Sequence, residues 1–327
     1  MSIHRKDGSE GQYPFYPWKA RCYRHWMFLK RLLPSFAKTR QRRSLPGPRR
    51  PLVSIHDLHL PMRGDNEALI RGLCQTAYVG DYQALCRILG RYKMYVDTRD
   101  VGLSAHLMLE GFWEMWVTHV ISSLVREGAT VADIGANLGY YTIILAELVG
   151  PNGHVHAFEP NPHLAGLLAK NVFVNGFEQR ASVHRMGLAD RIDQEMILIA
   201  KQDDPKNGYM TPYMDDLTQD VVHVLSTRLD SRVDWETIEF AKIDVEGAEQ
   251  LVWAGMQGLL DNGCMKTVLL EFTPDRYDDP KAFLDSMMKP GFALSRIDYN
   301  FGIVEVTPQQ ILNNFAANED IMLILRR

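Results

Sequence analysis

The first part of the chain has mainly helical periodicity. Apolar side chains recur three and four positions apart in residues 66–74 and 81–89, and most clearly in residues 112–126. Residues 93–97 are the exception, because they have the pattern of a short strand. The pattern therefore predicts a helical N-terminal extension over residues 51–127.

From residue 128 onward, short apolar segments alternate with amphipathic helical ones. This order predicts a doubly wound α/β domain over residues 128–327, because parallel strands need crossover helices that cover both faces of the sheet. Seven segments are predicted to form this mostly parallel sheet: residues 130–134, 154–158, 182–186, 238–243, 267–272, 292–297 and 321–325. Two further strands are expected at residues 195–199 and 221–225.

A turn that contains two glycines follows the first strand of this domain. Asp133 ends the strand, and Gly135 and Gly139 come after it. A dinucleotide site would have the spacing G-x-G-x-x-G, so that helix N–H groups hold a pyrophosphate. Here the spacing is G-x-x-x-G, and the carboxylate of Asp133 would repel a pyrophosphate but attract the sulfonium and ammonium groups of S-adenosylmethionine. The turn therefore favours that cofactor.

The next predicted strand also ends at an acidic residue, Glu159. Ligands of open α/β sheets bind beyond the carboxyl ends of the strands, where an acidic side chain can accept both ribose hydroxyls of an adenosine. Pro160 then begins the following helix. The alternative is that Asp133 and Glu159 are ordinary helix caps, but their occurrence at consecutive strand ends favours a cofactor site.

Four segments resemble the FkbM family of methyltransferases, and the resemblance extends from about Met94 to the C-terminus. They are Gly111–Glu114, Asp133–Tyr141, Phe158–Asn161 and Lys242–Glu249, of which the last is the most specific. The resemblance implies a class I methyltransferase fold, which is Rossmann-like, and methyl transfer to a hydroxyl oxygen. The expected acceptor is a hydroxyl-bearing small molecule, such as a sugar or secondary metabolite, or a glycan.

The resemblance also implies which residues contact S-adenosyl-L-methionine. The expected contacts are Glu114, Asp133, Gly135, Asn137, Gly139, Tyr140, Glu159, Pro160, Asn161, Gly187 and Asp244. One departure from the family pattern lies beside the expected adenine position, where this chain has Met186–Leu188 in place of Asn-Ala-Leu.

Carboxylates are expected to converge where the methyl group is transferred. Asp244 ends the fourth strand, Glu246 follows it, and Glu271 lies near the end of the fifth strand. A base within hydrogen-bond reach accelerates attack by a hydroxyl about 10²–10⁴-fold, and crowding raises the pKa of at least one carboxylate. We expect Asp244 or Glu246 to be the base and Glu271 to line the acceptor site.

Simpler roles for these acidic residues are also open. Glu246 and Glu249 would favour the N-terminus of the next helix, and for Glu249 this is the preferred interpretation. Clustered carboxylates suit Mg²⁺, but nothing in their spacing demands a metal, and none is assigned.

Two other functions fit the same cofactor. One is N-methyl transfer, which is disfavoured because residues 244–247 lack the Asn/Asp-Pro-Pro-Tyr/Phe turn common in enzymes that methylate nucleobases or amides. The other is a scaffold that binds the cofactor without catalysis.

Charge divides the chain into a basic arm and an acidic body. Residues 1–50 contain thirteen Lys and Arg but two Asp and Glu, and the remainder has an acidic excess. The arm is expected to be a flexible tail. The alternative is contact with anionic lipid through Trp26, Leu29 and Leu33. Nucleic acid is a disfavoured partner, because the acidic body would repel phosphate.

Composition and apolar segments bear on location. No apolar run approaches the roughly 20 residues of a membrane span, and the N-terminus lacks a signal-peptide pattern. The four cysteines form no C-x-x-C pair. These features predict a cytoplasmic protein, with peripheral contact at the inner face of a membrane as the alternative.

Overall fold

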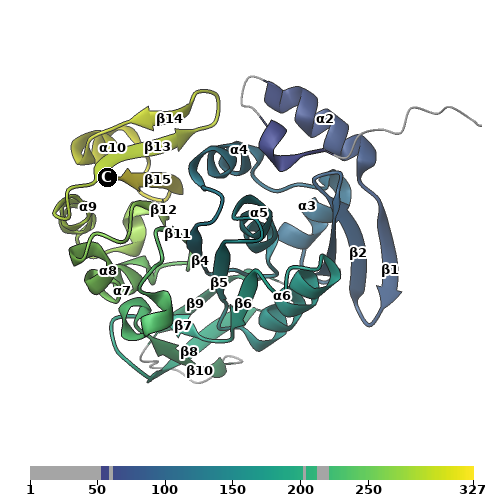
Figure 1. Ribbon diagram of the computed structural model, residues 1–327. Coiled ribbons are helices and arrows are strands. Elements are labelled where there is room, and N and C mark those ends of the chain that lie inside the picture. Colours follow the sequence, from purple (N-terminus) through teal and green to yellow (C-terminus); the bar gives the residue numbers. More distant parts are fainter. Residues whose placement is uncertain (1–52, 59–61, 202–203, 212–220) are drawn as a thin grey trace, which may run out of the picture. The chain divides into compact units, whose positions relative to one another are not determined.

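The computed structural model describes residues 53–58, 62–201, 204–211 and 221–327, which belong to one compact unit (Figure 1). The predictions for the basic arm, residues 1–50, lie outside the described residues. Within those residues, no helix has both the length and the apolar composition needed to cross a membrane.

An eight-stranded sheet forms the centre of this unit, with strand order β14-β13-β15-β12-β11-β4-β5-β6. Strands β12, β11, β4, β5 and β6 pair in parallel, whereas the pairs that involve β15, β13 and β14 are antiparallel. The bounds are β4 Thr130–Ile134, β5 His154–Phe158, β6 Ala181–His184, β11 Phe240–Ile243, β12 Thr267–Phe272, β13 Ala293–Asp298, β14 Gly302–Glu305 and β15 Ile321–Arg326. The predicted doubly wound, mostly parallel sheet is confirmed with all seven of its strands, and β14 is an eighth.

Helices cover both faces of this sheet, and each face has its own apolar core (Figure 1). One face packs against α4 (Met115–Leu124), α5 (Tyr140–Leu148) and α6 (Pro162–Val174), and the other against α7 (Glu249–Ala254), α8 (Gln257–Asp261), α9 (Pro280–Met288) and α10 (Pro308–Asn314). Alternation along β4 explains the two cores, because Val131 faces the first and its neighbour Ala132 faces the second.

The extension is partly a sheet, which corrects the prediction of a helical segment. After α2 (Arg63–Leu73), strands β1 (Thr76–Gly80), β2 (Gln83–Ile88) and β3 (Tyr92–Asp97) form an antiparallel sheet, and α3 (Leu103–Glu110) follows. The helix predicted over residues 81–89 is therefore wrong. The buried side chains of β2 are Ala84, Cys86 and Ile88, which alternate with a period of two. The spacing of the other apolar residues in this segment is helical and concealed that alternation.

Two asparagine side chains join the edge of β3 to α6. Asn171 accepts the N–H of Tyr95 at 2.7 Å and donates to the Tyr95 carbonyl at 3.0 Å. Asn175 pairs in the same way with the backbone of Lys93. Asn171 also donates to the carbonyl of Leu138, in the loop after β4, at 2.8 Å. The extension and the main domain therefore share one hydrogen-bond network.

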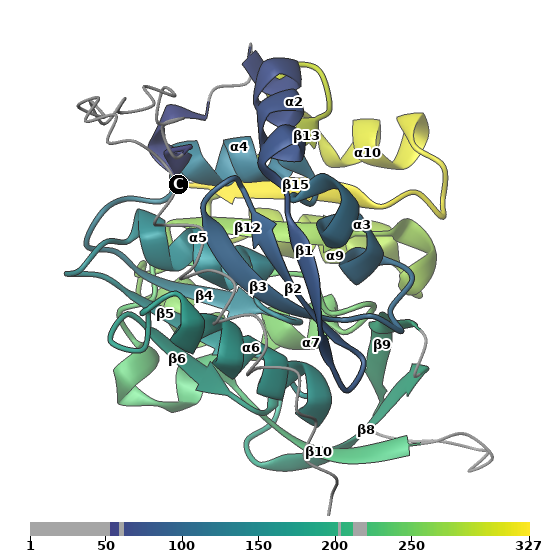
Figure 2. The same cartoon turned by 90° about the vertical axis from the view of Figure 1, so that its right-hand side faces the viewer.

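A second sheet lies below the central one in the view of Figure 2 and has the order β7-β10-β8-β9. Its strands are β7 Gly187–Leu188, β8 Gln194–Lys201, β9 Asp204–Thr211 and β10 Val221–Thr227. The two further strands expected at residues 195–199 and 221–225 correspond to β8 and β10, which pair antiparallel. This sheet contributes residues to the cavity described next.

Candidate active site

A cavity of about 360 Å³ lies beyond the carboxyl ends of the parallel strands. Its wall includes residues 135–137 after β4, residues 159–161 after β5 and residues 244–246 after β11. These strands are neighbours in the sheet, so loops that are far apart in the sequence meet at one edge. This is the edge at which ligands of doubly wound sheets bind.

Most of the predicted cofactor contacts line this cavity. The residues that do so are Glu114, Gly135, Asn137, Tyr140, Glu159, Pro160, Asn161 and Asp244. Asp133, Gly139 and Gly187 do not belong to the cavity wall, and each of them has a structural role behind it.

Gly139 and Gly187 are explained by packing. A Cβ atom at Gly139 would lie 2.5 Å from Leu168 Cδ1, where α5 meets α6. A Cβ atom at Gly187 would lie 2.3 Å from the sulfur of Met210, and it is Met210 that lines the cavity. Gly187 therefore packs against Met210, and its contact with the cofactor stays a prediction.

Asp133 supports the cavity from behind. Its side chain is fully buried, and the Thr142 hydroxyl donates to Oδ2 at 2.5 Å. Burial raises its pKa, which the nearby charge of Lys242 opposes. Asp133 does not form the surface of the cavity, and its attraction to the cofactor stays a prediction.

Gly135 allows two backbone loops to touch. Its φ is 77°, and a Cβ atom there would lie 1.8 Å from the carbonyl oxygen of Asp244. Any larger residue would force the loops after β4 and β11 apart. This glycine therefore sets the distance between the two parts of the site.

Glu159 is held in the cavity wall by backbone N–H groups. Its Oε2 accepts from Asn137 and its Oε1 from Asn161, both at 2.8 Å. Burial raises its pKa to about 7, although these N–H groups oppose the shift. The cap of α6 is the Asn161 side chain, which accepts from His163 and Leu164. Glu159 is therefore not needed as the cap, and its remaining acceptor capacity is available to a ligand.

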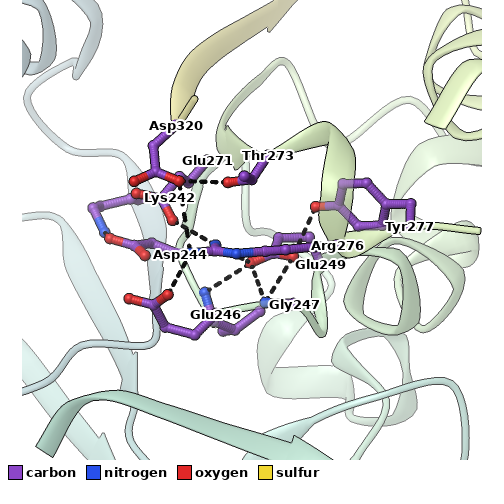
Figure 3. Close-up of polar contacts among 11 residues, drawn as sticks. Lys242, Asp244, Glu246, Gly247, Glu249, Glu271, Thr273, Arg276, Tyr277 and Asp320 are labelled. Atoms are coloured by element: carbon purple, nitrogen blue, oxygen red, sulfur yellow. Dashed lines mark hydrogen bonds and ion pairs between the residues drawn. The ribbon is translucent and has the colours of Figure 1, made fainter. Parts of the chain in front are cut away.

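Three carboxylates meet at the other end of the cavity (Figure 3). Asp244, Glu246 and Glu271 each place an oxygen within 4.8 Å of the others. Arg276 bridges two of them, since Nη2 donates to Glu246 at 2.6 Å and Nη1 to Glu271 at 2.8 Å. Lys242 donates to Asp244 at 2.9 Å. The structure thus brings all three predicted catalytic residues together with two cations, and the assignment of no metal stays a prediction.

Burial and mutual repulsion make two of these carboxylates more basic. The pKa of Glu246 is raised to about 7 by burial and by the charge of Asp244, against the opposing charge of Arg276. Burial and the charges of Asp244 and Glu246 also raise the pKa of Glu271, against the opposing charge of Arg276. A carboxyl group that titrates near neutral pH can accept a proton from a reacting hydroxyl.

The two cations of this site, Lys242 and Arg276, were not among the predicted site residues. Lys242 is 1% exposed and lies in a strand whose other members are apolar, a pattern that indicates a paired, functional charge. Burial lowers its pKa, but the charges of Asp244 and Asp133 outweigh this and raise it. Arg276 follows β12 in a short 3-10 helix, and nothing in its local pattern indicated the cavity.

The extension completes one side of the cavity with Leu103, Trp113 and Glu114. Glu114 has a φ of 36° and accepts a hydrogen bond from the Tyr141 hydroxyl at 2.8 Å. Glu114 therefore lies in the cavity wall, and its contact with the cofactor stays a prediction.

Comparison with known proteins identifies the domain. The profile of the methyltransferase FkbM domain matches residues 133–325, more than half of the chain. A protein-L-isoaspartate O-methyltransferase of Methanothrix thermoacetophila is 42% identical over 48 residues, which are 15% of this chain and 23% of that protein. A tRNA wybutosine-synthesizing protein 2 homolog of Danio rerio is 38% identical over 86 residues, 24% of this chain and 21% of that protein. The chain thus spans less than a quarter of either relative.

Solved structures include a methyltransferase FkbM from Methylobacillus flagellatus KT. It has a TM-score of 0.40 and 16% identity, and the match covers 62% of this chain and 45% of that one.

Proposed function

Because this chain belongs to the FkbM methyltransferase family, we propose that it is an O-methyltransferase that acts on a hydroxyl of a sugar, a glycan or a secondary metabolite. S-adenosyl-L-methionine is the cofactor of the family. When bound, it supplies an electrophilic methyl group on a sulfonium centre. The tasks left to the protein are to hold the two reactants in line and to accept a proton.

The residues of the cavity fit this cofactor. The buried carboxylate of Glu159, anchored by two N–H groups, suits the ribose hydroxyls of an adenosine. The glycine-containing loop at residues 135–137 offers backbone to the rest of the cofactor. At the other end, Asp244, Glu246 and Glu271 offer acceptor oxygens to the ammonium group of the cofactor.

One observation carries the proposal: a carboxylate with a pKa of about 7, Glu246, lies in the same cavity as Glu159. Glu246 would accept the proton of the acceptor hydroxyl as the hydroxyl oxygen takes the methyl group, and S-adenosylhomocysteine would leave as the methyl–sulfur bond breaks. Asp244 is held by the buried Lys242 at the end of β11, and we assign it to holding the reactants. Glu271, bound to Arg276, lines the acceptor side.

The test is transfer of labelled methyl from S-adenosylmethionine into fractionated glycans and metabolites of the host, with the methylated atom identified by mass spectrometry. We expect label on oxygen. Glu246→Gln should lower the rate about 10²-fold or more, because a general base contributes about 10²–10⁴-fold. Glu236→Gln is the matched control, since Glu236 is exposed and is not part of the cavity wall.

Each alternative function has its own outcome. Label on nitrogen would establish N-methyl transfer in place of the proposal. Cofactor binding without any transfer would indicate a scaffold.

A further inference from the structure

The turn after β11 has a backbone conformation that needs support. Glu246 has a φ of 55° and Gly247 a φ of 107°. A non-glycine residue adopts the left-handed region at an energetic cost, and such residues persist where the surrounding structure fixes them. In this conformation Glu246 lines the cavity, so the support of the turn bears directly on the site.

Glu249, the first residue of α7, supplies that support (Figure 3). Its side chain is fully buried. Oε1 accepts from the N–H of Val245 at 3.2 Å and of Gly247 at 3.0 Å, and Oε2 accepts from the same Gly247 N–H at 3.1 Å. One carboxylate therefore binds the backbone on both sides of Glu246.

Tyr277 fixes this carboxylate in turn. Its hydroxyl donates to Glu249 Oε2 at 2.8 Å. Its ring stacks on Phe272, the last residue of β12, with centroids 5.1 Å apart, and packs against Phe283 at 4.9 Å. The turn that carries Glu246 is thereby connected to the strand that carries Glu271.

We propose that Glu249 is a positioning residue, whose carboxylate shapes residues 244–247 so that Asp244 and Glu246 face the acceptor. Glu249 does not line the cavity, so it is not a candidate base. The inference rests on the proposed function, which assigns the proton transfer to Glu246. It replaces the preferred interpretation of Glu249 as a favourable charge at a helix N-terminus, an effect that any acidic residue in the first turn would provide.

Two conservative variants of the full chain separate these roles. Glu249→Asp keeps the negative charge at the start of α7 but is one methylene too short for the reach to Val245 and Gly247. Glu249→Gln removes the charge but keeps the length and an oxygen that accepts N–H bonds. Positioning predicts greater damage from aspartate, whereas a helix-charge role predicts greater damage from glutamine.

The measurements are thermal unfolding, affinity for S-adenosylhomocysteine, amide hydrogen exchange over residues 244–249, and transfer of labelled methyl to host acceptor fractions. For Glu249→Asp we expect faster exchange at Val245 and Gly247, a transfer rate about 10- to 100-fold lower, and cofactor affinity within about threefold of the wild type. Glu249→Gln should lower the rate less than Glu249→Asp does.

Contrary results have distinct meanings. Unchanged amide exchange in Glu249→Asp, or a lower rate in Glu249→Gln than in Glu249→Asp, would overturn the positioning role. A wild-type protein that binds S-adenosylhomocysteine but transfers no methyl group would overturn the proposed function instead, while the exchange result would still decide whether Glu249 holds the turn.

Discussion

The backbone N–H of Asn137 donates to Glu159 Oε2 at 2.8 Å, which ties the loop after β4 to the end of β5. Through this bond a single carboxylate both shapes the glycine-containing turn and lines the cavity. This part of the cavity wall is thus held in place by the protein's own hydrogen bonds, which we expect to lower the ordering cost of cofactor binding.

Glu159→Gln should weaken cofactor binding. Hydrogen bonds to a charged group contribute about 1.5–3 kcal/mol, so we expect the Kd for S-adenosylhomocysteine to rise about 10- to 100-fold in calorimetric titration. Glu178→Gln, at an exposed position outside the cavity, should bind like the wild type. Equal affinity in all three proteins would contradict the assignment of Glu159 to the cofactor.

Methyl transfer should increase with pH around neutrality. The proposed base, Glu246, has a pKa raised to about 7, and only its ionised form can accept a proton. The rate should therefore rise with a midpoint near pH 7. Arg276 opposes the raised pKa, so Arg276→Met should move the midpoint to higher pH. A midpoint that stays in place or moves to lower pH would argue against Glu246 as the base.

Acid should destabilise the fold through a histidine pair. His156 and His184 lie 3.2 Å apart between ring nitrogens, and burial lowers the pKa of each to about 4. In the unfolded chain histidine titrates near 6.5, so the unfolded state binds protons that the folded state does not. Stability should fall as the pH decreases from about 6.5 towards 4.

Replacement of one ring tests this origin. His156→Phe should reduce the loss of stability between pH 6.5 and 4 in denaturant titrations, because one buried titrating group is removed. His223→Gln changes an exposed histidine and should leave the pH dependence as it is. The same slope in His156→Phe as in the wild type would place the acid sensitivity elsewhere.

Asn171→Ala should loosen the extension and the cofactor loop together. The substitution leaves the backbone of Tyr95 and the carbonyl of Leu138 without their partner. Unsatisfied buried groups cost about 1–3 kcal/mol, so we expect about 2–3 kcal/mol lower unfolding free energy and weaker cofactor binding. Asn175→Ala, which touches only β3 and α6, should lower stability but not affinity. Equal affinity in the two variants would show that the hydrogen bonds between the extension and the loop after β4 do not affect cofactor binding.

The basic arm should bind anionic membranes if its arginines and lysines act with Trp26, Leu29 and Leu33. In that case the full chain sediments with phosphatidylserine vesicles at low salt and is released at high salt, since charge attraction to the surface is screened, whereas a flexible tail does not sediment with them. A chain without residues 1–50 that sediments equally well would refute this role.

The sequence predicted the central sheet well because its strands are short apolar runs that match the β-α order. Strand β2 was mistaken for a helix, since the alternation of Ala84, Cys86 and Ile88 is clear only once the buried side is known. The clustering of Asp244, Glu246 and Glu271 could be predicted because strand ends meet at one edge of a parallel sheet.

The parts of the site that could not be predicted depend on tertiary contacts. Arg276 and Tyr277 belong to a loop whose pattern does not indicate which way the side chains point, yet they contact Glu246 and Glu249. The inward turn of Asp133 towards Thr142 likewise depends on how α5 packs on β4.

Leu103, Trp113 and Glu114 form one wall of the cavity although they precede residues 133–325, which match the profile of the family domain. The residues that line the cavity therefore lie on both sides of residue 133, where the profile match begins. We therefore expect the acceptor selectivity of this protein to depend on residues before the profile match as well as on those within it.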